Sequence, residues 1–100
     1  MIAFLLACAG LVLAPSPPPA HAGTSIADAI VIQASTEDAG IKAEYAYLTA
    51  HPCDGGFWHV KTQALVTDHG KPYDVLSATC SNGGAERSFF FDISNYFGKM

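Results

Sequence analysis

The chain has 100 residues and a formal net charge of −4 at pH 7. A chain of this length forms one domain at most. Its charges are spread along the sequence without a run of one sign, and this argues against nucleic acid and anionic membrane surfaces as partners. No phosphate-binding loop or cofactor-binding motif occurs, so no cofactor is expected.

The first 22 residues have the layout of a secretory signal peptide. Residues 2–14 form an almost continuous apolar run, which is shorter than the about 20 apolar residues of a membrane span. Prolines follow it, and Ala20-His21-Ala22 supplies the small-x-small pattern that signal peptidase cuts. We expect cleavage after Ala22 and a periplasmic or secreted mature chain that is not stably inserted in a membrane.

The three cysteines divide between this leader and the rest of the chain. Leu5-Leu6-Ala7-Cys8 resembles a lipobox, but so few residues precede Cys8 that a lipoprotein is the less favoured alternative. Loss of the leader leaves Cys53 and Cys80, an even pair in an oxidising compartment, and we expect them to form a disulfide. A domain of this size often needs such a cross-link.

The remaining residues, 23–100, predict a single small α+β domain. A short apolar strand is expected at 29–33, and Ser35 or Thr36 is expected to cap a helix that ends before Pro52. An apolar stripe on this helix should cover the sheet, and it consists of Ile41, Tyr45 and Leu48.

Three further strands are predicted at 57–67, 73–80 and 87–93, the last two joined by a Ser-Asn-Gly-Gly turn. They would form a three-stranded antiparallel meander, and with the helix on one face they give a two-layer α+β sandwich that ends in a short C-terminal turn. The core is expected to take the inward-facing strand residues, which are Trp58, Val60, Val66, Leu76, Ala78, Phe89, Phe91 and Ile93.

Parts of the chain resemble a group of small secreted bacterial proteins of unknown function. The resemblance lies in a helix with the pair Glu44-Tyr45, a Gly-Lys-Pro-Tyr-Asp turn at 70–74, and FDISNYFGK at 91–99, which fits FDIS-x-(F/Y)-(F/Y)-G-K. It implies an exported bacterial single-domain protein and no particular activity. The order of helix and strands also has a topological likeness to PepSY domains, small extracytoplasmic modules linked to peptidase inhibition.

Two arrangements of residues suggest catalysis. Cys53 with His59 would supply a nucleophile and a base if the two side chains met, whereas a disulfide between Cys53 and Cys80 is the favoured alternative. Asp74 and Asp92 lie in the two arms of the predicted hairpin and would be a carboxylate pair if they were cross-strand neighbours. We favour local roles instead, with Asp92 accepting from backbone N–H groups of the tail and Asp74 bracing the turn at Lys71.

No metal site is expected. The chain has several possible ligands, which are His51, Cys53, Asp54, His59, Asp68 and His69, but they lack the spacing of known ligand sets.

The outer face of the predicted sheet is the candidate binding surface. Tyr73, Val75 and Phe90 point away from the expected core and would form an exposed apolar patch unless another segment covers them. The favoured hypothesis is therefore a non-catalytic module that binds a protein or peptide, with a possible inhibitory role, by this face or by an edge strand. The alternatives are a small hydrolase or thiol enzyme that uses Cys53 and His59, and a structural envelope protein that self-associates.

Overall fold

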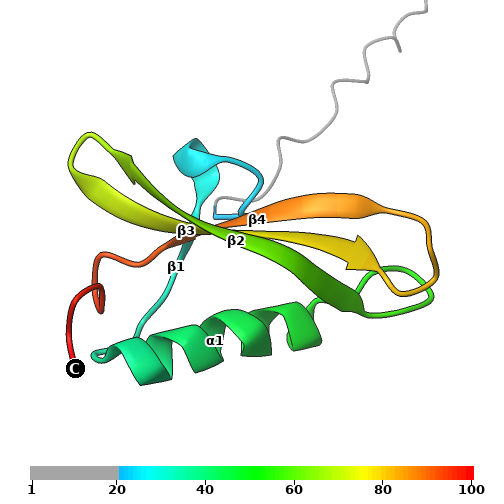
Figure 1. Cartoon of the computed structure of the whole chain (residues 1–100), viewed down its shortest axis with the longest axis horizontal. Helices are drawn as coiled ribbons and strands as arrows, with labels where there is room; N and C mark the ends of the chain where they lie inside the picture. The colour runs from blue at the N-terminus through cyan, green and yellow to red at the C-terminus, as the bar shows by residue number, and fades with distance from the viewer. Residues whose placement is uncertain (1–20) are drawn as a thin grey trace, which may run out of the picture.

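One helix lies across one face of a four-stranded sheet (Figure 1). The computed structural model describes residues 21–100, so that most of the expected signal peptide and Cys8 lie outside the described residues. The elements in chain order are the 3₁₀ turn η2 (Ile26–Asp28), β1 (Ile30–Val31), α1 (Glu37–Ala50), β2 (Trp58–Asp68), β3 (Lys71–Cys80) and β4 (Glu86–Asp92).

The sheet is mixed and has the order β1-β4-β3-β2. β2, β3 and β4 are antiparallel neighbours, but β1 adds a fourth strand that runs parallel to β4, with Ile30 opposite Phe91. The α+β class is therefore confirmed, and the prediction of a three-stranded antiparallel sheet is wrong. A run of consecutive apolar residues is typical of a strand buried on both faces, and such a strand fits beside β4 rather than outside the sheet.

Helix α1 begins as the sequence predicts. Thr36 is its N-cap, and the Thr36 hydroxyl accepts a hydrogen bond from the Ala39 N–H at 3.2 Å. The rotation of the helix differs from the prediction, because Ile41 and Tyr45 are 44% and 43% exposed. The face towards the sheet consists of Gly40, Glu44 and Leu48.

Gly40 explains this rotation. The ring of Tyr96, from the C-terminal tail, lies directly against the Gly40 backbone, and a methyl group at that position would overlap the ring. The close contact between the tail and the helix therefore determines which face of α1 is buried. Ile41 and Tyr45 stay exposed although their side chains are apolar.

A β-bulge in β2 changes which of its side chains face the helix. Val60 lies opposite Ala78, but the register shifts between Val60 and Thr62 around Lys61. An extra residue reverses the faces of all later positions in a strand. Beyond the bulge, the residues on the face of β2 towards α1 are therefore Gln63 and Leu65.

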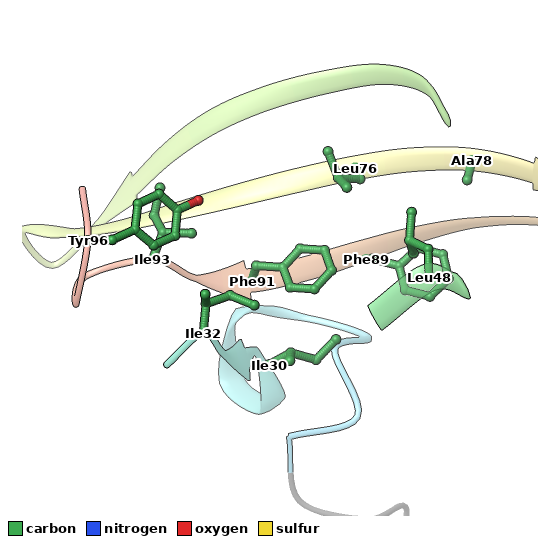
Figure 2. Close-up of a cluster of buried hydrophobic side chains, with 9 residues drawn as sticks. All are labelled: Ile30, Ile32, Leu48, Leu76, Ala78, Phe89, Phe91, Ile93 and Tyr96. Atoms are coloured by element: carbon green, nitrogen blue, oxygen red, sulfur yellow. The ribbon is translucent and has the colours of Figure 1, made fainter. Parts of the chain in front are cut away.

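Val66 is consequently not a core residue, contrary to the prediction. It lies opposite Tyr73 on the face away from α1. The other predicted core residues lie in or against a cluster of buried side chains (Figure 2), and Trp58 and Val60 pack on its margin. The members of this cluster are Ile30, Ile32, Leu48, Leu76, Ala78, Phe89, Phe91, Ile93 and Tyr96.

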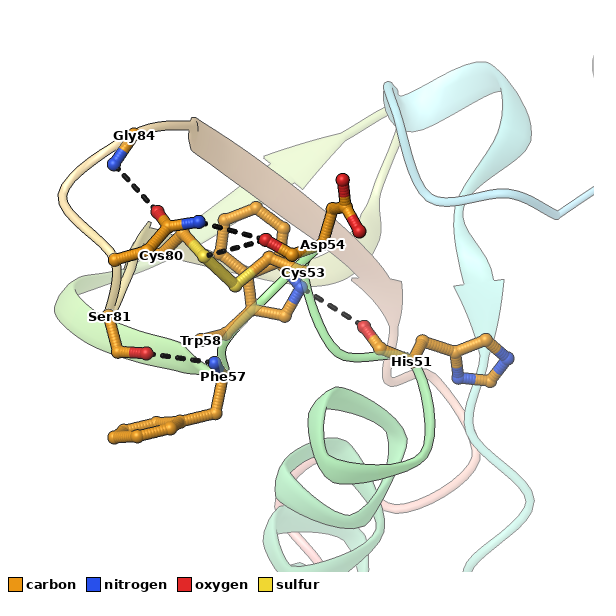
Figure 3. Close-up of a disulfide and its surroundings, with 9 residues drawn as sticks. His51, Cys53, Asp54, Phe57, Trp58, Cys80, Ser81 and Gly84 are labelled. Atoms are coloured by element: carbon orange, nitrogen blue, oxygen red, sulfur yellow. Dashed lines mark hydrogen bonds between the residues drawn. A yellow bond between two sulfur atoms is a disulfide. The ribbon is translucent and has the colours of Figure 1, made fainter.

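The predicted disulfide is present (Figure 3). Cys53, just after α1, is bonded to Cys80 at the end of β3, with an S–S distance of 2.06 Å and a Cα–Cα distance of 5.9 Å. Beside it, the Trp58 indole N–H donates to the His51 carbonyl at 3.0 Å, and the Trp58 ring meets Phe89 edge-on with centroids 5.2 Å apart. The C-terminal end of α1 is thus joined to the sheet by a covalent bond and by aromatic packing.

Candidate binding groove between α1 and β2

Exposed apolar side chains gather along the side of the molecule where α1 faces the edge strand β2. Six large apolar side chains in residues 21–100 are exposed, and all but the terminal Met100 line hollows at this place. The five are Ile41, Tyr45, Phe57, Leu65 and Phe97. We call this feature the α1–β2 groove.

The groove consists of two hollows that follow one another along α1 and β2. One hollow, of about 590 Å³, lies beside Tyr45 and Leu48 of the helix and Trp58 and Val60 of the strand. The other, of about 330 Å³, lies one helical turn earlier, beside Ile41. Its opposite wall is formed by residues beyond the bulge, Gln63 and Leu65.

β2 forms the open side of the groove. It is the last strand of the sheet order and has β3 as its one neighbour among the described strands. A strand paired on one side presents a row of backbone N–H and C=O groups on the other. Most of the 11 residues of β2 are exposed, so these groups are accessible to another extended chain.

A buried polar cluster lies next to the second hollow, and its members Gln63, Asp74 and Tyr96 help to line that hollow. Glu44 of α1 is fully buried, and its Oε2 accepts a hydrogen bond from the Tyr96 hydroxyl. Asp74 of β3 is 4% exposed and accepts a hydrogen bond from the Gln63 amide at 2.7 Å. Glu44 and Asp74 contact one another across the interface between the helix and the sheet.

The contact between two carboxyl groups requires a proton. Glu44 Oε1 is buried and has no donor among the described groups if both acids are ionised. Burial, followed by the hydrogen bond with Asp74, raises the pKa of Glu44 from its usual 4.5 to about 8. At neutral pH Glu44 is therefore protonated and bonds to Asp74. Burial and the bond to Glu44 likewise raise the pKa of Tyr96, which stays a donor.

The predicted neighbours Asp74 and Asp92 lie on opposite faces of the sheet. Asp74 is opposite Phe91, towards the helix, whereas Asp92 is opposite Tyr73. Asp92 accepts from the Ser94 N–H at 3.0 Å, as the local alternative predicts. Lys71 pairs with Asp92 at 3.1 Å and not with Asp74, so the prediction that Asp74 braces the Lys71 turn is wrong.

The predicted patch Tyr73, Val75 and Phe90 lies on the face away from α1. Tyr73 is 7% exposed, and Val75 and Phe90 are half-buried. The Phe90 N–H donates to the Gly23 carbonyl at 2.9 Å, and the η2 turn lies on this side of the sheet (Figure 1). Less apolar surface is open here than in the α1–β2 groove, and partner binding by these three residues stays a prediction.

The two residues proposed for thiol catalysis do not form a catalytic pair. Cys53 is bonded to Cys80 and has no free thiol, whereas His59, opposite Thr79, is among the residues that line the larger hollow. In residues 21–100 no three His, Cys, Asp or Glu side chains come together in a group that would hold a metal ion. Within the same range, no helix has the length and apolarity needed to cross a membrane.

The sequence argument missed Glu44 and Tyr96 as members of a polar cluster. A Glu on an amphipathic helix is ordinarily a solvated residue, and nothing local marks it as buried. The three residues of the cluster are far apart in the sequence: Glu44 is in the helix, Asp74 follows Gly-Lys-Pro-Tyr, and Tyr96 is in the C-terminal stretch FDISNYFGK.

Comparison with known proteins identifies no relative. No family model matches the chain, and neither a curated protein nor a solved structure is significantly similar to it. The function is therefore argued from the groove itself.

Proposed function

We propose that the protein is an exported, non-catalytic binding module that takes an extended segment of a partner polypeptide into the α1–β2 groove. The observation that supports this function is the gathering of five exposed large apolar side chains beside an open strand edge. Monomeric domains rarely leave such side chains clustered unless a partner covers them.

The bound segment would extend the sheet as a fifth strand next to β2. Its backbone would bond to the free N–H and C=O groups of β2, which gives affinity for any extended chain. Successive side chains of a strand point to opposite faces, so every second side chain would enter the groove. Apolar side chains there would pack against Tyr45 and Leu65, and they would set the preference for particular sequences.

Two other functions have less support. A thiol enzyme needs a free nucleophile, and Cys53 is in a disulfide. Self-association would use the same β2 edge, with a second copy in place of the peptide. The bulge at Lys61 and the charge of that residue disfavour flat edge-to-edge pairing of two copies. Export is part of the proposal because disulfides persist in oxidising compartments.

The proposed function is tested by selecting binders from a random peptide library displayed on phage, with the purified protein as bait. The expected result is a set of peptides in which apolar residues alternate with others. Leu65→Lys places a positive charge in the groove at an exposed position, where it opposes both an apolar and a basic side chain, and it should weaken binding of the best peptide about tenfold or more.

Val75→Thr is the matched control, because it makes a side chain polar on the opposite face of the sheet at nearly constant volume. It should leave the affinity unchanged. If Val75→Thr abolishes binding and Leu65→Lys does not, the outer face is the site and the groove proposal is wrong. If no peptide is enriched, and sedimentation shows a concentration-dependent dimer that Leu65→Lys dissociates, the groove serves self-association instead.

A further inference from the structure

The hollow beside Ile41 differs from the rest of the groove because acidic residues help to line it. Its apolar lining includes Ile41, Leu65 and Phe97. Asp74 and Glu37 also line it, and the buried Glu44 contacts Asp74. No Lys, Arg or His is among the residues that line it.

The buried carboxyl groups of Glu44 and Asp74 have no cation beside them, and the adjacent hollow has room for one. Apart from the proton shared between Glu44 and Asp74, the buried Glu44 Oε1 has no partner in the described part of the protein, and Asp74 accepts one further hydrogen bond, from Gln63. Two buried carboxyl groups in contact cannot both be ionised unless a positive charge joins them. In the free protein a single proton fills this role.

We propose that this hollow receives a basic side chain, Lys or Arg, of the peptide segment that binds in the α1–β2 groove. The inference rests on the proposed function and adds a specificity to it. The methylene stem of Lys or Arg packs against apolar walls while its charged end reaches a carboxylate. A charge-assisted hydrogen bond to Asp74 and Glu44 then replaces the bond that the proton made.

The ligand chemistry favours an organic cation over a metal ion. Hard metal ions take six or more oxygen ligands, and no group of three acidic or other ligand side chains occurs in residues 21–100. Two carboxyl groups beside a hollow with an apolar lining fit an ammonium or guanidinium group, whose remaining donors are satisfied by neighbouring oxygens and water.

Binding of the basic side chain is coupled to proton release. As the cation arrives, the Glu44 O–H bond breaks, the carboxylate stays in the pair, and the proton passes to the solvent. The titratable and charged groups around Glu44 are Asp74 from β3, Tyr96 from the tail and Glu37 from α1 itself, and none of them is basic. Affinity for a basic peptide therefore rises as pH increases from about 6 to about 9, because protons then compete less.

The test compares a library-selected peptide with its analogue in which norleucine replaces the one basic residue. Norleucine keeps the methylene stem and removes the charge. For the wild-type protein we expect the analogue to bind about tenfold more weakly or worse. Titration calorimetry in two buffers of different ionisation enthalpy should show release of about one proton per peptide at neutral pH, from the single shared proton of the pair.

The double variant Glu44→Gln with Asp74→Asn keeps the shape of the carboxyl pair and removes its charge. In this variant the two peptides should bind equally and no proton should be released, and thermal unfolding confirms that the variant is folded. Selected peptides without a basic residue, or equal binding of both peptides to the wild type, would overturn the inference and leave the groove function intact. If no peptide binds, the proposed function fails, and this inference fails with it.

Discussion

The two ends of the interface between α1 and the sheet are closed in different ways. At the C-terminal end of α1, Leu48 packs on Phe89, and the Cys53–Cys80 bond fixes the following loop to β3. One helical turn nearer the N-terminus of α1, Glu44 meets Asp74 and Tyr96, and an open hollow lies beside them. Figure 2 shows the arrangement, with Leu48 and Phe89 at one end of the cluster and Tyr96 at the other.

In the proposed function, one of these regions stabilises the fold and the other binds the partner. Apolar burial and a cross-link stabilise the fold and leave nothing to recognise a ligand. A buried acid pair contributes little net stability, because its desolvation offsets its bonds, yet it places specific chemistry beside an open edge. We therefore assign the disulfide end to folding and the acidic end to recognition, and the following predictions test this assignment from the largest expected effect to the smallest.

Among the substitutions, removal of the disulfide should have the largest effect on stability. Cys53→Ser with Cys80→Ser releases a closure of 27 residues, and the free energy of unfolding should fall by about 3 to 4 kcal/mol. Chemical denaturation measures the change. A loss below about 1 kcal/mol would show that the aromatic packing around Trp58 holds this end without the bond.

The acid pair should make the protein less stable as pH rises. The folded protein holds the Glu44 proton more tightly than the unfolded chain, so this stabilisation is complete below about pH 4.5 and is lost as pH increases through about 8. At about 1.4 kcal/mol for each unit of pKa shift, the loss over this pH range is on the order of 5 kcal/mol.

Glu44→Gln isolates this contribution, because the amide keeps the bonds to Tyr96 and Asp74 but does not titrate in this range. The difference in unfolding free energy between the wild type and the variant should change across pH 4.5 to 8 in favour of the variant. The histidines are common to both proteins, and their effects cancel. A difference that stays constant with pH would contradict a protonated Glu44.

Gly40→Ala tests the close approach of helix and tail. On a solvent-exposed helix, Ala in place of Gly is stabilising by about 1 kcal/mol. Here the new methyl group would overlap the Tyr96 ring, so we expect destabilisation of about 1 to 3 kcal/mol. The sign of the change in melting temperature decides between the two, and Ala46→Gly, on the exposed side of α1, gives the ordinary propensity effect as control.

The ion pair between Lys71 and Asp92 should contribute least to the stability of the fold. The Lys71 side chain is half-exposed, and exposed pairs are worth about 0 to 1 kcal/mol. Although burial of Asp92 opposes it, bonds from Ser94 and Lys71 together lower the pKa of Asp92. Lys71→Ala should reduce stability by about 0.5 kcal/mol at neutral pH, and a loss above about 2 kcal/mol would contradict the description of this pair as peripheral.

Local chemistry accounts for what the sequence predicted correctly. The Thr36 cap follows from a hydroxyl side chain placed before a helical pattern. The break between the strands predicted at 57–67 and 73–80 is a two-residue hairpin loop of His69 and Gly70, which both have positive φ angles, of 51° and 78°. The disulfide follows from cysteine parity and the expected compartment.

The features that the sequence did not predict depend on contacts between distant parts of the chain. The bulge at Lys61 reverses the second half of β2, and no residue type marks it. The rotation of α1 depends on Gly40 meeting Tyr96, which lies 56 residues later in the sequence. The bulge and the rotation of α1 are both needed for Gln63 and Leu65 to face Ile41. The groove therefore could not be predicted from hydrophobic periodicity.

The central claim is that a peptide binds as a strand on the open edge of β2. Amide hydrogen exchange with and without a library-selected peptide tests it most directly, because a new strand must bond to backbone groups that now face solvent. We predict slower exchange at alternate residues of β2 and no change at Val75 and Phe90. Unchanged exchange along β2 when the peptide is bound would contradict the claim.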